Sequence, residues 1–250
     1  TRRSSDLLDL INGLVYRKKA PLPSFKFLML DGPEQEPPVA VDLDDSAWET
    51  VEPYSYWIGW RKDFALRTKF SVPADFDPEC PIALYLPLGE PDDFSHPEAL
   101  AYLDGEPYAG SDRHHQEILL PSYVIDGAEH LLALHGWTGL YGWFRGQPDT
   151  ELFMRECAIV QIDQPTRNFI SCARVSLGTA DQLDSNHPAK GLLYNALNNA
   201  FALLELHEPF DDRFYDSVSA AHAALQDGIS QAGPALNVAI SAAGHAHIDV

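Results

Sequence analysis

Hydrophobic and polar positions follow three successive patterns along the chain. Apolar residues recur at helical spacing over residues 5–17, which predicts a short amphipathic helix. From about residue 48 to residue 178, short apolar or alternating runs are separated by turn signals, as in the strands of an antiparallel sandwich or barrel. The run ISCARVSL, residues 170–177, is interpreted as the last of these strands. No internal repeat interrupts the order of the three patterns.

Helical spacing of apolar residues returns after about residue 180 and predicts two helices. Pro188 suits the first turn of one helix, and Asn186 or His187 can cap it. Asp211 or Asp212 can cap the other helix. A Gly-Pro pair then ends the helical pattern.

The final apolar run, LNVAISAAGHAHIDV, ends in a cluster of polar residues. A buried parallel strand whose carboxyl end carries a site has this appearance. The sequence therefore predicts a mainly β protein: an antiparallel, jelly-roll-like β-sandwich, a two-helix connector and the first strand of an incomplete α/β catalytic domain. The predicted segments are residues 1–23 (N-terminal helix and linker), 24–180 (β-sandwich), 181–234 (helical connector) and 235–250 (first strand of the catalytic domain).

Charge and cysteine content exclude some classes of partner. Seventeen basic against thirty-seven acidic residues give a net charge of −20, which argues against non-specific binding to nucleic acid or to an anionic membrane. No apolar stretch reaches the length of a membrane helix, and the amino-terminal apolar run is broken by polar residues, unlike a signal peptide. Cys80, Cys157 and Cys172 lack metal or disulfide spacing. We therefore expect a cytoplasmic protein with reduced thiols.

The strongest candidate for chemistry is the polar cluster at residues 244–249, Gly-His-Ala-His-Ile-Asp. Side chains alternate between the two faces of a strand, so His245, His247 and Asp249 would share one face. Imidazole nitrogen and carboxylate oxygen are common zinc ligands. A polar strand end without a metal would have the same spacing, so the residues alone leave both interpretations open.

The segment NVAISAAGHAHIDV resembles the first catalytic-domain strand of glycoside hydrolase family 38 α-mannosidases. It is most similar to the cytosolic and vacuolar branch, although the Ala-Trp that follows the motif there is not in this chain. The stretches AYLDGEPYAGSDRHHQEILLP, HLLALHGWTG and FALLELHEPFDDRFY resemble the β-sandwich and the connector of that branch. The resemblance extends over the chain from about Trp60.

This resemblance implies particular roles for the last residues. His247 and Asp249 match the positions that supply two zinc ligands, and His245 matches a neighbouring position beside the metal or the substrate. The remaining ligands, the nucleophilic Asp of the retaining reaction and the general acid are implied to follow Val250. We therefore expect zinc as the cofactor of the whole enzyme, an incomplete zinc site in this chain, and no activity from the 250 residues alone.

Two further groups of residues are candidates for contact with sugar or with another domain. Asp112 lies in the polar stretch GSDRHH, where it could instead bond nearby backbone N–H groups. Trp137 and Trp143 lie in an aromatic, glycine-rich stretch, where large rings can stack on sugars or fill a core or a domain interface.

The implied function is the amino-terminal part of a zinc-dependent retaining α-mannosidase that acts on terminal α-mannosyl residues of glycans. Its expected partners are α-mannoside glycans and the rest of its own catalytic domain, with self-association into a homo-oligomer as an open alternative. A non-catalytic carbohydrate-binding sandwich and a structural or assembly module are the other functions that the sequence leaves open.

Overall fold

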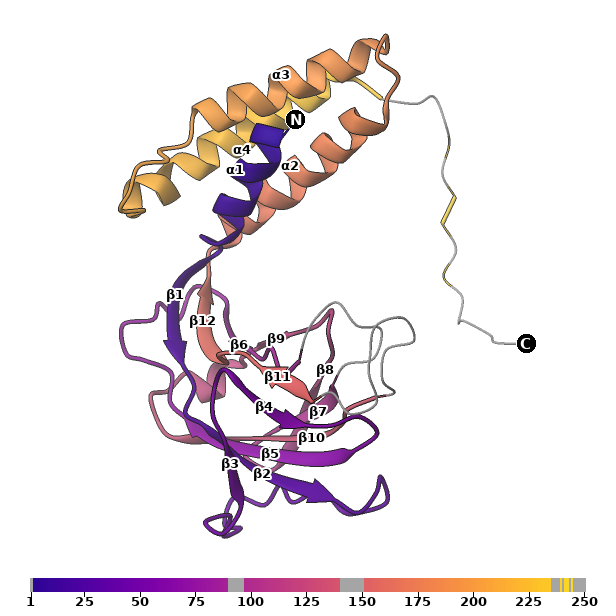
Figure 1. Cartoon of the computed structure of the whole chain (residues 1–250). Helices are drawn as coiled ribbons and strands as arrows, with labels where there is room; N and C mark the ends of the chain where they lie inside the picture. Colours follow the sequence, from indigo (N-terminus) through magenta and orange to yellow (C-terminus); the bar gives the residue numbers. More distant parts are fainter. Residues whose placement is uncertain are drawn as a thin grey trace, which may run out of the picture. The chain divides into compact units, whose positions relative to one another are not determined.

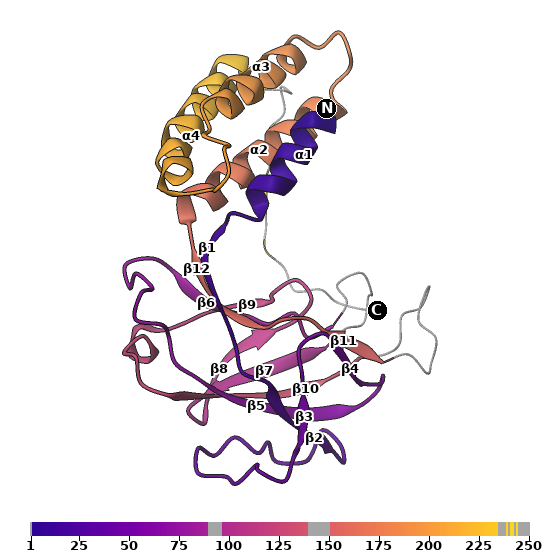
Figure 2. The same ribbon diagram turned by 60° about the vertical axis from the view of Figure 1, so that its left-hand side comes forward.

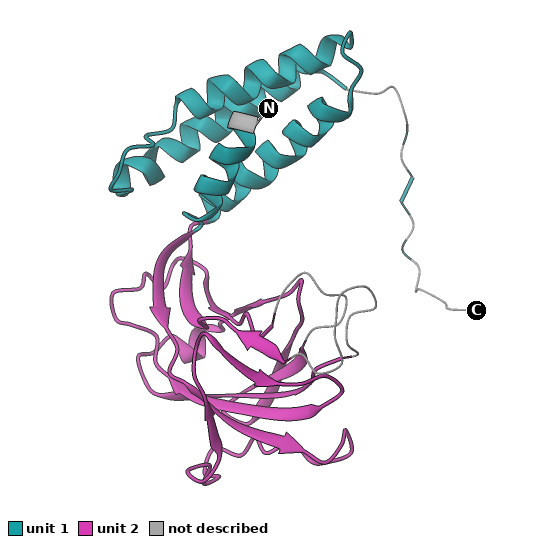
Figure 3. Cartoon of the chain, in the orientation of Figure 1, with its two compact units in different colours: residues 1–15, 164–250 teal, residues 16–163 magenta. Residues whose placement is uncertain are grey.

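The computed structural model describes residues 2–89, 97–139 and 151–234, together with residues 239, 241, 242 and 244. The chain forms two compact units, coloured separately in Figure 3. One unit comprises Tyr16–Asp163, and the other combines Thr1–Val15 with Gln164–Val250. The first unit is built from β-strands and the second from α-helices (Figure 1).

The β unit contains two larger antiparallel sheets and one small one. The four-stranded sheet has the order β1-β12-β6-β9, and the six-stranded sheet has the order β3-β2-β5-β10-β7-β8. The strands of the first are β1 (Tyr16–Pro21), β12 (Ala158–Ile162), β6 (Ile82–Tyr85) and β9 (Glu117–Leu119). Those of the second are β3 (Glu49–Val51), β2 (Phe25–Leu30), β5 (Asp63–Phe70), β10 (His130–Trp137), β7 (Glu98–Leu103) and β8 (Glu106–Ser111). β4 (Ser55–Ile58) pairs with β11 (Leu152–Met154), and a 3-10 helix, η1, covers Ser122–Val124.

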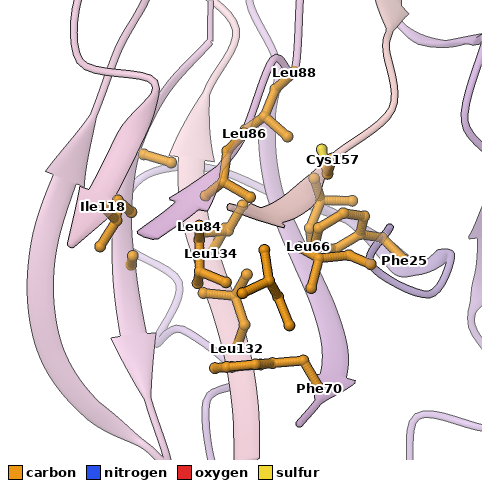
Figure 4. Packing of buried hydrophobic residues seen from close by; sticks show 14 of the residues in the cluster. Phe25, Leu66, Phe70, Leu84, Leu86, Leu88, Ile118, Leu132, Leu134 and Cys157 are labelled. Carbon is orange, nitrogen blue, oxygen red and sulfur yellow. The ribbon is translucent and has the colours of Figure 1, made fainter. Parts of the chain in front are cut away.

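The hydrophobic core of the β unit is formed by the facing sides of the two larger sheets. Leu84 of β6 and Ile118 of β9 join Leu66 of β5 and Leu134 of β10 in one buried cluster (Figure 4). Because alternate residues of a strand point to opposite faces, Leu132 and Leu134 face this core while His135 and Trp137 face outward. The predicted β-sandwich is therefore confirmed.

Part of the outward face of the six-stranded sheet is covered by the loop of residues 31–48. This loop is attached through Arg67 of β5, whose side chain is only 1% exposed. The Arg67 Nε donates to Oδ2 of Asp45 at 2.7 Å, and its guanidinium also donates to the carbonyl oxygen of Pro38 at 2.8 Å. The guanidinium carbon lies 5.9 Å from the ring centre of Trp48, within cation–π range.

The β7–β8 hairpin turns through Asp104 and Gly105, both at positive φ (51° and 90°), as a two-residue type I′ turn requires. The Asp104 carboxylate accepts the backbone N–H of Leu131 at 2.8 Å and contacts Nδ1 of His130 at 2.7 Å. The other ring nitrogen of His130 lies 3.0 Å from Oδ1 of Asp126. Burial lowers the pKa of His130, but the hydrogen bonds to the two carboxylates outweigh it, so the pKa is raised.

We expect the β unit to lose stability as the pH rises through the raised pKa of His130, because His130 then loses its proton. A raised folded pKa gives a contribution that is complete below the ordinary value of 6.5 and is lost as the pH passes the folded value. The carboxylates are partly exposed, so the loss should be small, about 0.5–1 kcal/mol. Urea unfolding followed by tryptophan fluorescence measures it, and His130→Gln should remove most of the pH dependence. An equal dependence in His130→Gln would assign it to another group.

The helical unit joins the amino-terminal helix to three later helices: α1 (Arg2–Asn12), α2 (Gln164–Gln182), α3 (Pro188–Ala202) and α4 (Asp212–Ala232). His187 caps α3 by accepting the backbone N–H of Ala189, and Asp211 caps α4 by accepting that of Arg213. Phe169 of α2 and Phe201 of α3 meet edge to face, with ring centres 5.9 Å apart. Within the described ranges, no helix is both long enough and apolar enough to cross a membrane.

One close helix contact in this unit depends on a glycine. A Cβ atom built at Gly228 of α4 would lie 2.5 Å from Cβ of Ala196 in α3. Real Cβ atoms do not approach so closely, so α3 and α4 pack as they do because one side chain is absent and the other is small.

Three predictions on secondary structure need correction or are left untested. The strand predicted at residues 170–177 is wrong: this stretch lies inside α2, so the sandwich unit ends at Asp163 and three helices follow it instead of two. The linker predicted before residue 24 contains strand β1, which pairs with β12. The strand predicted at residues 235–250 lies mostly outside the described residues, and the four described positions there belong to no helix or strand.

Candidate functional site

A pocket of about 610 Å³ opens on the outward face of the six-stranded sheet, within the β unit. Its floor crosses β5, β10, β7 and β8, which lie side by side in Figures 1 and 2. Pro33 of the covering loop also lines it. The lining side chains with polar or aromatic chemistry are Asp63, Glu98, Asp112, His115, His135 and Trp137.

Strand register places two carboxylates on either side of an exposed indole ring. Trp137 of β10 is paired with Asp63 of β5 on one side and with Glu98 of β7 on the other. Residues paired in this way point to the same face of the sheet, with Cβ atoms about 4.5–5.5 Å apart. The Trp137 residue is 39% exposed, a large value for so apolar a side chain.

The next set of paired residues across these strands is less polar, and one of its positions has no side chain. His135 of β10 is paired with Leu100 of β7, and Leu100 is paired with Gly110 of β8. A Cβ atom built at Gly110 would have no heavy atom within 4 Å. The pocket is therefore partly open because residue 110 carries no side chain.

Gly136 lies between His135 and Trp137, and unlike Gly110 it is closely surrounded by other atoms. A Cβ atom there would lie 2.5 Å from Cζ of Phe64 and 2.6 Å from the backbone oxygen of Glu98. No space is left for a side chain at residue 136, because neighbouring atoms already occupy it. This close packing fixes the path of β10 next to Trp137.

The rim of the pocket beyond β8 is held by Asp112 and His115. Oδ1 of Asp112 accepts the backbone N–H groups of His114 and His115 at 2.6 and 2.8 Å. Nδ1 of His115 lies 3.0 Å from the same carboxylate. The hydrogen bond from the His115 side chain and those from the backbone lower the pKa of Asp112 to about 2. Asp112 is therefore ionised at neutral pH and organises its own loop.

The chemistry offered by this pocket is an apolar ring surface beside oxygen acceptors. Within the described part of the chain, no hydrogen bond or ion pair engages the carboxylates of Asp63 and Glu98, so both can accept from a ligand. The described lining includes no lysine or arginine. No group of three or more His, Cys, Asp or Glu suited to holding a metal occurs among the described residues.

The structure brings together two of the residues that the sequence predicted as contacts for sugar or another domain. Asp112 and Trp137 line the same pocket. Trp143 and the predicted metal-site residues His245, His247 and Asp249 lie outside the described residues. The sequence reasoning missed Asp63, Glu98 and His135, and only the alternation of outward residues in HLLALHGW could have indicated His135.

Two other tryptophans of the sequence belong to the sandwich interior. Trp57 packs against the core, meets Phe64 edge to face at 5.0 Å and donates its indole N–H to the carbonyl oxygen of Leu88 at 2.9 Å. Trp60 also packs against the core. These rings fill the core and offer no surface in the pocket.

Comparison with known proteins gives only remote similarities. No family model and no curated protein matches the chain. Among solved structures, Bacteroides uniformis β-glucuronidase is similar with a TM-score of 0.37 and 16% identity over 57% of this chain and 18% of that one. Faecalibacterium prausnitzii β-glucuronidase is similar with a TM-score of 0.43 and 11% identity, over 58% of this chain and 31% of that one. A glycosyl hydrolase family 2 member from Bacteroides cellulosilyticus is similar with a TM-score of 0.41 and 16% identity, over 59% of this chain and 21% of that one.

The chain thus spans less than a third of each of these three enzymes. Each TM-score is below 0.5 and each identity below 25%, so the similarities carry no argument on fold or function. Two of the three are named as β-glucuronidases and one as a family 2 member, and none is named as an α-mannosidase. The β-sandwich assignment rests on the strand pairing and the core described above.

Proposed function

We propose that this chain is the amino-terminal part of a zinc-dependent retaining α-mannosidase that hydrolyses terminal α-mannosyl residues of glycans. The observation that carries the proposal is the segment Gly-His-Ala-His-Ile-Asp at residues 244–249, with its resemblance to family 38 enzymes. The resembling stretches upstream, and a β-sandwich followed by helices, support the same family.

The donor atoms of His247 and Asp249 suit zinc, which takes imidazole nitrogen and carboxylate oxygen in proteins. In the proposed site these two residues hold the metal, and His245 lies beside it or beside the sugar. Bound zinc would supply an electron-pair acceptor for hydroxyl oxygens of the mannose. Two ligands alone bind a metal weakly, so the remaining ligands must come from the rest of the catalytic domain.

The substrate class proposed here is neutral, and the partner of this segment is the rest of its own catalytic domain. We place the enzyme in the cytoplasm, in keeping with three free thiols, and leave association into a homo-oligomer as a further proposal. A neutral sugar does not require the net charge of −20, which we assign to solubility.

The proposal is tested by expressing the gene to its natural end and measuring cleavage of an aryl α-mannoside. We expect activity that EDTA removes and zinc restores, and a loss of about 100-fold or more in His247→Ala and in Asp249→Ala. Zinc content of the purified variants gives a second measurement that does not depend on turnover. His207→Ala, at an exposed position of the helical unit, serves as the control and should keep full activity.

Full activity and full zinc content in both variants would overturn the zinc assignment. The absence of α-mannoside cleavage by the complete wild-type protein would overturn the α-mannosidase assignment. The 250-residue chain is expected to have no activity, because the resemblance places the nucleophile and the general acid after residue 250.

A further inference from the structure

The pocket on the outward face of the six-stranded sheet combines three features. It has one exposed aromatic face, Trp137, and two carboxylates paired with it in register, Asp63 and Glu98. It also has a vacant sheet position at Gly110, where a side chain would otherwise project. Its volume of about 610 Å³ lies within the usual range for small-molecule sites.

The carboxylates select for a ligand that donates hydrogen bonds. Asp63 and Glu98 can only accept, and no described residue donates to them. Asp112 at the rim is a third acidic group, ionised at neutral pH. Several hydroxyl groups directed to both sides of the indole would satisfy these acceptors.

Charge selects against acidic ligands. The described lining has three carboxylates and, besides the imidazoles of His115 and His135, no group that can become cationic. A uronic acid, a sugar phosphate or a sulfated sugar would meet like charges at close range, which costs binding free energy. The ligand that fits is uncharged.

The single ring argues against a cationic ligand. Proteins that bind quaternary or methylated ammonium groups enclose the cation with several aromatic walls. Besides the two imidazoles, Trp137 carries the one aromatic ring in the described lining, so several aromatic walls of that kind are not present there. An exposed indole with a carboxylate on the neighbouring strand at either side is complementary to a ring that has C–H groups on its face and hydroxyls around its rim.

We propose that this pocket binds a neutral hexopyranose, with the sugar ring stacked on Trp137 and its hydroxyls donating to Asp63 and Glu98. All lining residues of the pocket belong to the unit Tyr16–Asp163, and none of them is a residue of the proposed zinc site. The pocket would hold a glycan without cleaving it. The proposal does not depend on the mannosidase proposal, and either can fail alone.

Binding is tested on the 250-residue chain by calorimetry with methyl α-mannopyranoside, methyl β-glucopyranoside, glucuronic acid and glucosamine. We expect dissociation constants of about 1–10 mM for at least one neutral glycoside, as suits a single shallow ring, and binding at least tenfold weaker for glucuronic acid. Absence of binding by both neutral glycosides at about 50 mM would overturn the proposal. Preferred binding of glucuronic acid, or of glucosamine as a cationic sugar, would also overturn it.

Two variants locate the ligand. Trp137→Ala removes the ring surface and is expected to weaken binding at least tenfold. Gly110→Val adds a side chain that meets no protein atom within 4 Å at its Cβ, so it should block the pocket while the unfolding midpoint is kept or raised. When the unfolding midpoint of Gly110→Val is kept or raised, lost binding in this variant cannot be attributed to unfolding.

Matched controls test the location. Gly59→Val adds the same side chain at another glycine with no atom within 4 Å, and Tyr123→Ala removes an exposed ring outside the pocket. Both should bind as the wild type does. Unchanged affinity in Trp137→Ala and Gly110→Val would show that the sugar binds elsewhere and would overturn the assignment.

Discussion

Replacing Arg67 by alanine is expected to lower the free energy of unfolding of the β unit by about 3–4 kcal/mol. The guanidinium is almost completely buried and donates to Asp45 and to the carbonyl oxygen of Pro38. The substitution removes both hydrogen bonds, leaves the Pro38 carbonyl without its donor and empties the space of a long side chain. The loop of residues 31–48 loses its attachment to the sheet at the same time.

The two units can be followed separately, because all five tryptophans of the chain lie between residues 48 and 143. Urea unfolding monitored by tryptophan fluorescence therefore reports on the β unit. Lys69→Ala is the matched control: Lys69 lies on the same strand but is exposed and paired with an exposed Glu129, so its loss should cost less than about 0.5 kcal/mol.

Asp45→Asn provides an independent check of the same contact. It keeps the shape of the side chain but leaves the Arg67 charge uncompensated, and we expect a loss of about 2–3 kcal/mol. If Arg67→Ala and Asp45→Asn were both as mild as Lys69→Ala, the buried ion pair would not be what holds the loop on the sheet.

Replacing Gly228 by valine is expected to destabilise the helical unit by about 2–4 kcal/mol and to leave the β unit unchanged. The added Cβ alone would overlap Cβ of Ala196 and approach its Cα to 3.1 Å, so α3 and α4 must separate. Far-UV circular dichroism at the helix band follows this unit, while tryptophan fluorescence follows the other.

Gly178 of α2 is the matched control for Gly228. A Cβ atom at Gly178 meets no heavy atom within 4 Å, so Gly178→Ala should stabilise the helical unit by about 0.5–1 kcal/mol through helix propensity alone. A stabilising effect of Gly228→Val would contradict the close packing of α3 on α4. A loss of stability in the tryptophan signal as well would contradict the expectation that Gly228→Val acts on the helical unit alone.

The sandwich and the last two helices can be predicted from the sequence, because the spacing of their apolar residues stays regular over long segments. α2 was mistaken for a strand because eight residues, ISCARVSL, fit both alternation and helical spacing. The helical repeat becomes clear only over the whole element, in which Phe169, Ala173, Leu177 and Ala180 are buried on one face. The structure therefore corrects the end of the sandwich to Asp163.

The candidate pocket could be predicted only in part. Trp137 and Asp112 can be identified from the sequence as candidate contact residues, because they lie in glycine-rich and polar stretches. Asp63 and Glu98 cannot, because each lies far from Trp137 in the sequence and meets it only through strand register. A single sequence contains no signal for that register, nor for the vacancy at Gly110.

The path of the chain through its two units has a consequence for biosynthesis. The chain enters the β unit at Tyr16 and leaves it after Asp163, and Tyr16 is paired with Ile162 across β1 and β12. The β unit can therefore fold as soon as it has emerged from the ribosome. Helix α1 is made before the β unit and its packing partner α2 after it, so the helical unit cannot be completed until the whole β unit has been synthesised.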